Sequence, residues 1–379
     1  MPTTSEALAL QAQLEAELAA VTDAQTRLLV AAWAVAWSEI SADLTTTMVD
    51  LLTDAPVTAA GRVSRATLFR SVRLRGALEH VAARLDRLAY DAGITITSDL
   101  ASMVERAARA QDAIVAVQLP DLADPGTLPL SQQGPVPTRQ SIVRQVWQPA
   151  ELDALDAIVR RSTEQITSRL RPVPAETADV VRRELIRGVA VGDNPRNTAR
   201  RMVQRAGHGF NGGLSRALTI ARTEMLDAHR AGAGAGQARH PQVLAGWVWL
   251  AHLDEKTCPA CLRMHGELFS LTEAGPQGHP NCRCARMPKT KSWADLGFEG
   301  LDEPGDAVVD ARAWFEALTP AQQLRIMGPG RLAMLQSGEA EWVDLAYLRS
   351  SQTWRDSWQV TPLHVLRSQN SGGRAARAS

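Results

Sequence analysis

All four cysteines of this 379-residue chain lie within 27 residues, in two close pairs. The first pair is Cys258-Pro-Ala-Cys261 and the second is Cys282-Arg-Cys284. Thiolates at such short spacing converge on one tetrahedral ion, because each turn presents two sulfur atoms while the chain between the pairs forms a small hairpin. The spacing therefore predicts a zinc site with Cys258, Cys261, Cys282 and Cys284 as its ligands.

Two histidines, His265 and His279, lie in the same window, and each could replace one cysteine. A zinc ion with four protein ligands has no open position for an activated water, so the predicted role of the metal is structural. Two alternatives stay open: buried cysteines without a metal in a tight loop, and a catalytic zinc.

Length and composition describe an ordinary globular protein of two or three domains, with 45% hydrophobic and 22% charged residues. A formal net charge of zero disfavours a uniformly basic nucleic-acid binder, but the charges are unevenly distributed. Residues 182–239 hold eleven arginines and four acids, whereas residues 292–362 hold five arginines and eleven acids. Four arginines of the basic segment are candidates for contact with DNA or a protein partner: Arg196, Arg200, Arg201 and Arg205.

No membrane span or secretory signal is expected. The most apolar run, residues 28–37, has ten residues, about half of the ~20 that cross a bilayer. The segment Met1-Pro-Thr-Thr-Ser-Glu6 lacks the basic and apolar regions of a signal peptide. A protein that stays in a reducing cytoplasm uses clustered cysteines for metals more often than for disulfides.

The elements that must position the cysteines are mostly helical, so the predicted fold class is α+β, mainly α. Helical periodicity predicts helices over 22–52, 64–91 and 98–117, the first opened by a capping box from Thr22 to Gln25. Five prolines between Pro120 and Pro137 predict an extended connector.

Further helices are expected over 141–170, 175–191, 197–206 and 214–231. Gly207 to Gly213 is predicted to be a loop, and the run Gly232-Ala-Gly-Ala-Gly236 is expected to fray or end the last of these helices.

The aromatic and β-branched segment Trp247 to His252 predicts a strand that leads into the cysteines. After Pro288 the chain is acidic and contains tryptophans, with short helices expected over 307–318, 320–326 and 331–335. The predicted organisation is a helical N-terminal region, a Pro/Gly-rich linker, a helical middle domain, a β-rich four-cysteine module and an acidic C-terminal extension. These segments cover residues 1–119, 120–140, 141–240, 241–291 and 292–379.

Arg222 and Glu224 lie on the helix before the strand. Side chains two positions apart on a helix point in different directions, so these two do not form a compact catalytic pair. Each is expected to make a structural ion pair with the cysteine module or with a neighbouring helix. The sequence has no phosphate-binding glycine loop, H-E-x-x-H pair or G-x-S-x-G elbow, and no catalytic residue is assigned.

One succession of residues resembles a known family. It runs from Arg216 to Glu224, through the tryptophan-bearing strand and Asp254, to Thr257-Cys-Pro-Ala-Cys261, His265-Gly266 and His279-Pro-Asn-Cys-Arg-Cys284. In order and spacing it resembles the phage Mu F-like minor head proteins over about residues 185–288, and the Ala/Arg-rich composition resembles actinobacterial-phage members. The residues that carry the motif beside the cysteines are Arg222, Glu224, Asp254, Gly266, Pro280, Asn281 and Arg283.

The resemblance implies a minor capsid protein of a tailed bacteriophage. Such a protein acts in head morphogenesis near the portal, is found in the virion and is assembled in the host cytoplasm. Its implied partners are the portal, scaffold or major capsid protein, with DNA as a further partner. The opposed charges of the chain could instead pair within or between copies.

Two other functions are weighed against this one. A capsid maturation protease would be an enzyme, but the chain lacks a serine protease elbow. A zinc-ribbon DNA-binding protein would need a basic recognition helix after its metal ligands, whereas Lys289-Thr-Lys291 leads into the acidic segment.

Overall fold

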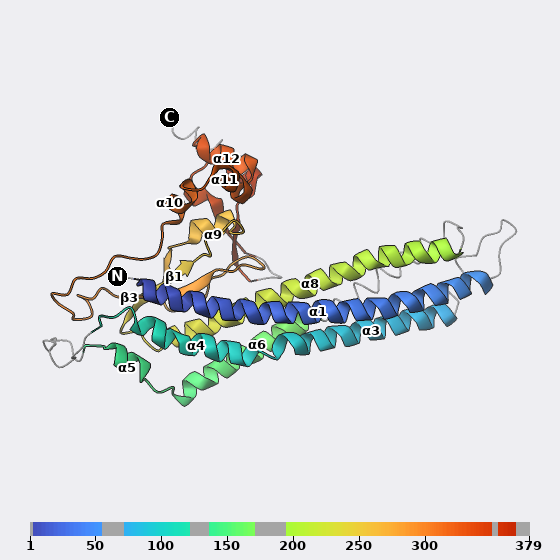
Figure 1. Cartoon of the computed structure of the whole chain (residues 1–379), viewed down its shortest axis with the longest axis horizontal. Helices are drawn as coiled ribbons and strands as arrows, with labels where there is room; N and C mark the ends of the chain where they lie inside the picture. Colours follow the sequence, from blue (N-terminus) through green and yellow to red (C-terminus); the bar gives the residue numbers. More distant parts are fainter. Residues whose placement is uncertain (1–2, 55–71, 122–135, 171–194, 351–354, 369–379) are drawn as a thin grey trace. The chain divides into compact units, whose positions relative to one another are not determined.

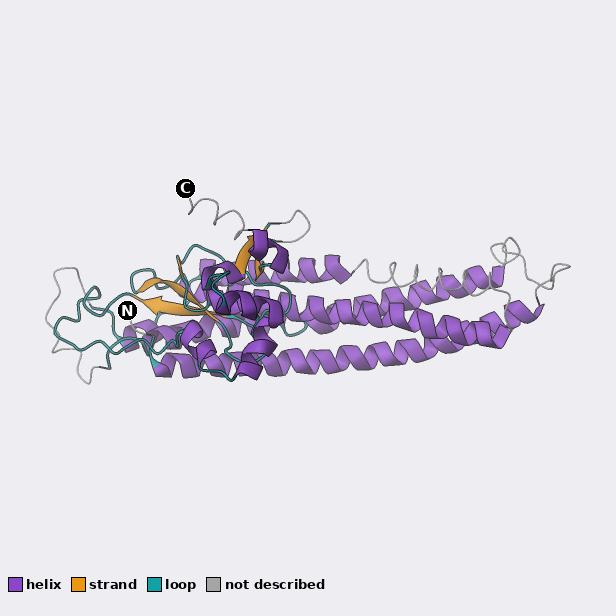
Figure 2. Ribbon diagram, turned by 90° about the horizontal axis from the view of Figure 1, so that it is seen from above, coloured by secondary structure: helices purple, strands orange, loops and turns teal. Residues whose placement is uncertain are grey.

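The structure, a computed structural model, describes residues 3–54, 72–121, 136–170, 195–350 and 355–368. In these ranges the chain is mainly helical and carries two small antiparallel sheets (Figures 1 and 2). This confirms the predicted α+β, mainly α class. The predicted helix over 175–191 lies outside the described residues.

The elements, labelled as in Figure 1, are as follows. The long helices are α1 (Ser5–Asp54), α3 (Val72–Thr97), α4 (Leu100–Ala116), α6 (Pro149–Leu170) and α8 (Pro195–Gln237). The short helices are α5 (Arg139–Val143), α9 (Pro259–Met264), α10 (Ala311–Glu316), α11 (Pro320–Met327), α12 (Pro329–Gln336) and the 3-10 helix η2 (Trp342–Leu345). The strands are β1 (Leu244–Leu250), β2 (Leu268–Phe269), β3 (Ala285–Thr290), β4 (Ala346–Arg349) and β5 (Ser357–Val360).

The chain forms two compact units, each assembled from separate parts of the sequence. The first unit combines Met1–Leu18, Ser102–Ile158 and Leu226–Ser379, and the second combines Ala19–Ala101 and Val159–Met225. This grouping follows spatial proximity, whereas the five segments proposed from the sequence are consecutive. Their boundaries stay predictions.

The second unit is a helical bundle with an aromatic core. Leu29, Trp33 and Ile40 of α1 are buried, as their 3-4 spacing predicts. The indole N–H of Trp33 donates to the carbonyl of Phe210 in α8 (3.3 Å), and the ring of Phe210 lies 4.9 Å from that of Trp37. These contacts hold α1 against α8 inside this unit.

The predicted helix start at Thr22 is wrong, because α1 begins at Ser5 and continues through the supposed capping box. The side chain of Gln25 does not reach back to the backbone of Thr22. Its amide group donates instead to the carbonyl of Ile96 (3.2 Å) and to the carboxylate of Asp99 (3.1 Å), at the junction of α3 and α4. A contact between distant helices has replaced the local cap.

The predicted glycine loop over Gly207 to Gly213 is also wrong, because α8 runs unbroken from Pro195 to Gln237 and ends directly after the run Gly232 to Gly236. Its glycines allow other groups to approach closely. A Cβ atom on Gly207 would lie 3.1 Å from the ring of Trp37, and one on Gly236 would lie 2.2 Å from the carbonyl oxygen of Ala108 in α4. Tight packing therefore compensates for the low helix propensity of glycine.

By length and composition alone, α1 is long and apolar enough to cross a membrane. A window of 18 residues in this helix reaches a mean hydropathy of 1.2, and 18% of that window is buried. Leu29, Trp33 and Ile40 of this helix are buried, but most of the apolar stretch is not. The expectation of no membrane partner stays a prediction.

The first unit is built around a three-stranded antiparallel sheet in the order β2-β1-β3. The predicted strand at Trp247 is β1, which pairs Leu250 with Ala285 of β3 and Trp247 with Phe269 of β2. The rings of Trp247 and Phe269 stack at 4.4 Å. Every residue of β3 is buried, although β3 is an edge strand of this sheet.

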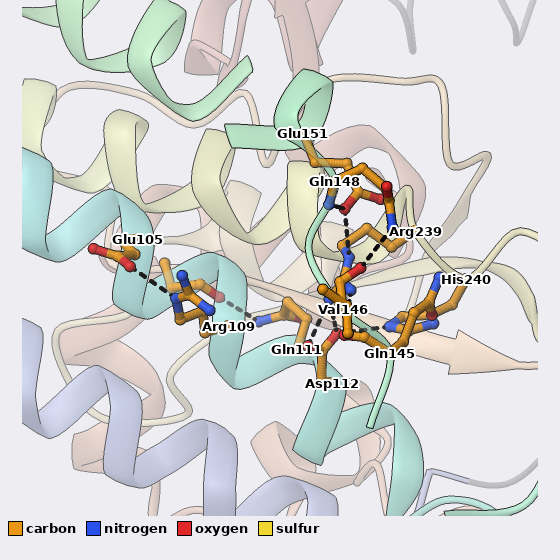
Figure 3. A network of polar contacts seen from close by, with 11 residues as sticks. Glu105, Arg109, Gln111, Asp112, Gln145, Val146, Gln148, Glu151, Arg239 and His240 are labelled. Carbon is orange, nitrogen blue, oxygen red and sulfur yellow. Dashed lines mark hydrogen bonds and ion pairs between the residues drawn. The ribbon is translucent and has the colours of Figure 1, made fainter. Parts of the chain in front are cut away.

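A polar network fixes the end of α8 in the first unit (Figure 3). The Arg239 guanidinium binds both carboxylate oxygens of Asp112 in α4 (2.7 and 2.6 Å) and donates to the carbonyl of Gln145 (2.8 Å). His240 also contacts Asp112 (2.8 Å), and the guanidinium of Arg239 lies 4.0 Å from the centre of the Trp147 ring. This network positions the start of β1 relative to α4.

The chain after β3 packs onto the same unit. Phe315 of α10, Met327 of α11 and Leu345 of η2 form a hydrophobic core with Leu262 of α9. The three predicted short helices are present here with shifted ends, whereas the β4–β5 hairpin was not predicted.

The beginning of the described chain contacts this region too. The carbonyl of Thr3 accepts a hydrogen bond from the backbone of Ala307 (2.9 Å), and the ammonium group of Lys289 contacts Thr3 (3.1 Å) and Asp306. Thr3 is fully buried. Segments about 300 positions apart in the sequence thus pack against each other in the first unit.

The substitution Gly236→Ala tests the role of the helical glycines. The new Cβ would collide with the backbone of Ala108, so we expect it to lower the free energy of unfolding by about 1–3 kcal/mol. Gly212→Ala is the matched control on the same helix, because nothing lies within 4 Å of its added Cβ, and it should stabilise by about 0.5–1 kcal/mol. Thermal unfolding of both variants measures the difference, and equal effects of the two would contradict the packing role.

Candidate metal centre

The first cysteine pair lies at the N-terminus of α9. Cys258 is the N-cap residue, and its sulfur accepts a hydrogen bond from the backbone N–H of Cys261 (3.4 Å). Pro259 follows at the first helical position, where the fixed φ of proline favours a helix start. The C-P-A-C sequence therefore turns both sulfur atoms toward the same end of one short helix.

The second pair lies where a turn enters β3. The backbone N–H of Cys282 donates to the carbonyl of His279 (3.0 Å), and Asn281 between them has a positive φ of 62°. Cys284 directly precedes β3. Because β3 pairs with β1, this turn is held close to the segment that carries α9.

The sulfur and nitrogen atoms meet at distances that suit a metal ion. The Nε2 atom of His279 lies 3.2 Å from Sγ of Cys258 and 3.6 Å from Sγ of Cys261, and Sγ of Cys261 lies 3.7 Å from Sγ of Cys282. Two groups form, Cys258/Cys261/His279 and Cys261/Cys282/Cys284, and within each the donor atoms are all within 4.8 Å of one another. All four cysteines are free thiols. Zinc at about 2.3 Å from each sulfur would place two sulfurs about 3.8 Å apart, so these residues fit a zinc ion.

The two candidate histidines are placed differently. The Nδ1 atom of His265 accepts from the backbone N–H of Ala251 (2.9 Å), and its Nε2–H donates to the carbonyl of Val309 (3.0 Å). Both ring nitrogens of His265 are therefore engaged with the backbone. His279 alone of these two directs a ring nitrogen at the sulfurs.

Without a metal, the pKa shifts in the cluster favour an ionised Cys258 and a protonated His279. Hydrogen bonding to Cys261 lowers the pKa of Cys258 to about 5, and His279 contributes to that shift. Hydrogen bonding to Cys258 raises the pKa of His279 to about 9. A thiolate and an imidazolium thus face each other, and a metal that binds here must displace the imidazolium proton.

An ion pair ties the two cysteine turns together. The Arg283 guanidinium binds both carboxylate oxygens of Asp254 (2.8 and 2.6 Å), and the same carboxylate accepts from the backbone N–H of Lys256 (2.8 Å). The hydrogen bonds from Arg283 hold the pKa of Asp254 well below its usual range. Two residues of the sequence motif therefore act as one bidentate pair beside the candidate metal centre.

A buried arginine of α8 holds the second cysteine turn. The guanidinium of Arg230 donates to the carbonyls of Cys284 (2.9 Å) and Cys282 (2.6 Å), and to the carboxylate of Asp227 (2.9 Å). Asp227 also accepts three hydrogen bonds from Arg355, in the segment that leads into β5. One carboxylate thus connects the cysteine turn, α8 and the C-terminal segment.

Arg230 and Asp227 were missed in the sequence, although their i,i+3 spacing on one helix was a usable signal. The residues of this helix that were expected to form ion pairs are Arg222 and Glu224. Glu224 is buried and pairs with Arg169 of α6 in the second unit, the neighbouring-helix alternative that was considered. Arg222 is half-buried on the same helix.

The other motif residues have backbone roles. Gly266 has a positive φ of 86° directly after α9, and its N–H donates to the carbonyl of Trp249 (2.9 Å). The carbonyl of Pro280 contacts Nδ1 of His279 (2.8 Å). The candidate DNA or partner contacts fall on α8, at positions whose side chains are outside the described part of the structure: Arg196, Arg200, Arg201 and Arg205.

The substitution Gly278→Ala tests the packing of the cysteine turn. A Cβ atom at this position would lie 2.3 Å from Sγ and 2.5 Å from Cβ of Cys282, so Cys282 must move. We expect a loss of about 1–3 kcal/mol in stability and weaker metal binding. Gly305→Ala is the control, because nothing lies within 4 Å of its added Cβ. Thermal unfolding and metal titration measure both effects, and a Gly278 variant that matches the control would refute this packing.

Comparison with known proteins identifies the segment that builds this centre. No curated protein and no solved structure matches the chain. A family model described as "Phage Mu protein F like protein" matches residues 179–287. This span contains both cysteine pairs, His279 and Arg230, which donates to the carbonyls of Cys282 and Cys284. The match covers under a third of the chain, and it makes this segment, not the chain as a whole, similar to the phage Mu F-like proteins.

Proposed function

We propose that this chain is a minor capsid protein of phage head morphogenesis that acts near the portal, and that a structural zinc ion fixes its shape. The observation that carries the proposal is the convergence of four cysteines and His279 at one point of the first unit. The protein would travel in the virion after assembly in the host cytoplasm. Its partners would be the portal, scaffold or major capsid protein.

The donor atoms favour zinc over harder cations. Thiolates and imidazole suit zinc, whereas magnesium and calcium prefer oxygen ligands. The sulfurs of Cys261, Cys282 and Cys284 are buried among Trp247 and Trp249. Four protein ligands in such surroundings close the coordination sphere, which supports a structural ion over a catalytic one.

Direct contacts join the candidate zinc site to α8 and to the C-terminal segment. Arg230 links the cysteine turn to α8, and Asp227 links Arg230 to Arg355. On the other side, the backbone N–H of Trp358 in β5 donates to the carbonyl of Gln277 (2.8 Å), next to the turn that carries His279. A rigid module of this kind suits a protein that works by docking.

The alternatives have less support. His240, His265 and His279 are engaged with Asp112, with backbone groups and with cysteines, so none of the three is placed as the base of a capsid maturation protease. A zinc-ribbon DNA reader is disfavoured because the chain after β3 is acidic and would be repelled by DNA phosphates.

Zinc content is the direct test of the structural centre. We expect about one zinc per chain in protein purified under reducing conditions, and roughly 10 °C or more of lost melting temperature on chelation, because the binding free energy of a structural zinc contributes to folding. Cys258→Ser should lose the metal. The control Ser270→Ala removes an exposed hydroxyl that contacts Thr272 and should keep it. A wild-type protein without zinc, with unchanged melting on chelation, would rule the centre out.

Salt dependence tests the proposed DNA contact. We expect binding of the full chain to duplex DNA to weaken as salt rises, with the slope of log K against log salt near −0.9 for each phosphate contacted. Replacing Arg196, Arg200, Arg201 and Arg205 by glutamine should reduce that slope by up to about 4. Arg312→Gln in the acidic segment is the control. A flat salt dependence would exclude DNA and leave the portal as the partner to assay by co-purification.

A further inference from the structure

We propose that a C-terminal strap closes the metal centre, so that zinc leaves or enters only when the strap opens. The strap is the described part of the chain from α10 to β5, residues 311–350 and 355–360. The proposal rests on the proposed zinc centre and adds a device that controls access to it. Because the family model matches residues 179–287, the cysteines and their cover come from different parts of the chain.

The strap holds the helix that carries the first cysteine pair. Leu262 of α9 is 0% exposed, and it lies in one hydrophobic cluster with Phe315, Met327 and Leu345 of the strap. Helix α9 has only six residues, and a helix this short is not stable without tertiary contacts. The apolar packing of the strap therefore keeps the C-P-A-C turn in place.

The sulfur atoms themselves are covered in part by the β4–β5 hairpin. Ala346 of β4 and Trp358 of β5 pack against the cluster that contains Cys261, Cys282 and Cys284. These three thiols are buried. An apolar shell around a metal centre controls the access of solvent, so this cover restricts the approach of water and of chelators to the sulfurs.

A backbone contact joins the strap to the second cysteine turn. The N–H of Trp358 donates to the carbonyl of Gln277 (2.8 Å), and Trp358 forms a parallel β-bridge with Gly278. A Cβ atom added to Gly278 would lie 2.3 Å from Sγ of Cys282. The strand β5 thus runs along a piece of backbone that directly contacts one of the sulfurs.

Arg355 fastens the strap to α8. Its guanidinium donates three hydrogen bonds to the carboxylate of Asp227 (3.0, 2.8 and 2.6 Å). The same carboxylate accepts from Arg230 (2.9 Å), which holds the carbonyls of Cys282 and Cys284. A substitution of Arg355 therefore loosens the strap but leaves Asp227 paired with Arg230.

Zinc release from the full-length protein to excess EDTA tests the closure. We expect the wild-type rate to become independent of EDTA concentration, because local opening of the strap limits it. Arg355→Gln should release zinc at least tenfold faster. Arg355→Lys keeps the charge but loses the bidentate geometry, so its rate should lie between the two. Equal rates in the wild type and Arg355→Gln would overturn the proposal.

Ile142→Ala is the matched control for general destabilisation. Ile142 is buried in a different hydrophobic cluster of the same unit, so its truncation should lower the melting temperature. We expect the zinc release rate of this variant to stay at the wild-type value. An acceleration as large as that of Arg355→Gln would overturn the proposal, because loss of stability alone would then explain both.

Thiol alkylation of the zinc-free protein gives a readout that does not depend on the metal. The buried thiols of Cys261, Cys282 and Cys284 should react with iodoacetamide at least tenfold faster in Arg355→Gln than in the wild type. A wild-type protein that binds no zinc would refute the proposed centre, whereas this comparison would still test the strap. Equal reactivity of the three thiols in both proteins would refute the strap itself.

Discussion

The first unit depends on the meeting of two cysteine turns that lie twenty residues apart in the sequence. Bringing three polarisable, partly ionised sulfurs within 4.8 Å of one another is unfavourable by itself, since like charges repel and the chain between the turns loses freedom. Three sets of contacts offset that cost. The sheet pairs β1 with β3, Arg283 binds Asp254 across the turns, and Arg230 holds the carbonyls of the second turn. A bound cation would neutralise the remaining repulsion.

Glycine has a different structural role in each part of the molecule. In α8 it is a packing residue, since Gly232 and Gly236 allow the backbone of α4 to come close to the helix. At Gly278 it makes space for the sulfur of Cys282, and at Gly266 it supplies a positive φ directly after α9. The role of a glycine therefore depends on its three-dimensional surroundings. It can allow two helices to pack closely, leave room for a neighbouring side chain or permit a turn.

Local patterns predicted the parts of the fold that depend on local chemistry. The strand at Trp247, the short C-terminal helices and the close approach of the cysteines all follow from spacing and residue type. The start of α1 and the continuity of α8 could not be predicted in this way, because a buried amide pairing of Gln25 and a backbone contact of Gly236 involve residues more than seventy positions away. The partners of the motif residues had the same limitation. Asp254 and Arg283 were both recognised, but nothing in the sequence paired them.

The contacts of Thr3 with Asp306, Ala307 and Lys289 affect how the chain is made. A ribosome releases the first residues of α1 long before β3 and the acidic segment exist. All segments of the second unit precede residue 226, whereas the first unit also contains residues 226–379. During that interval Ala7 and Leu14 of α1 lack Met287 of β3, with which they share a buried cluster in the finished protein. Until then, this buried cluster is incomplete.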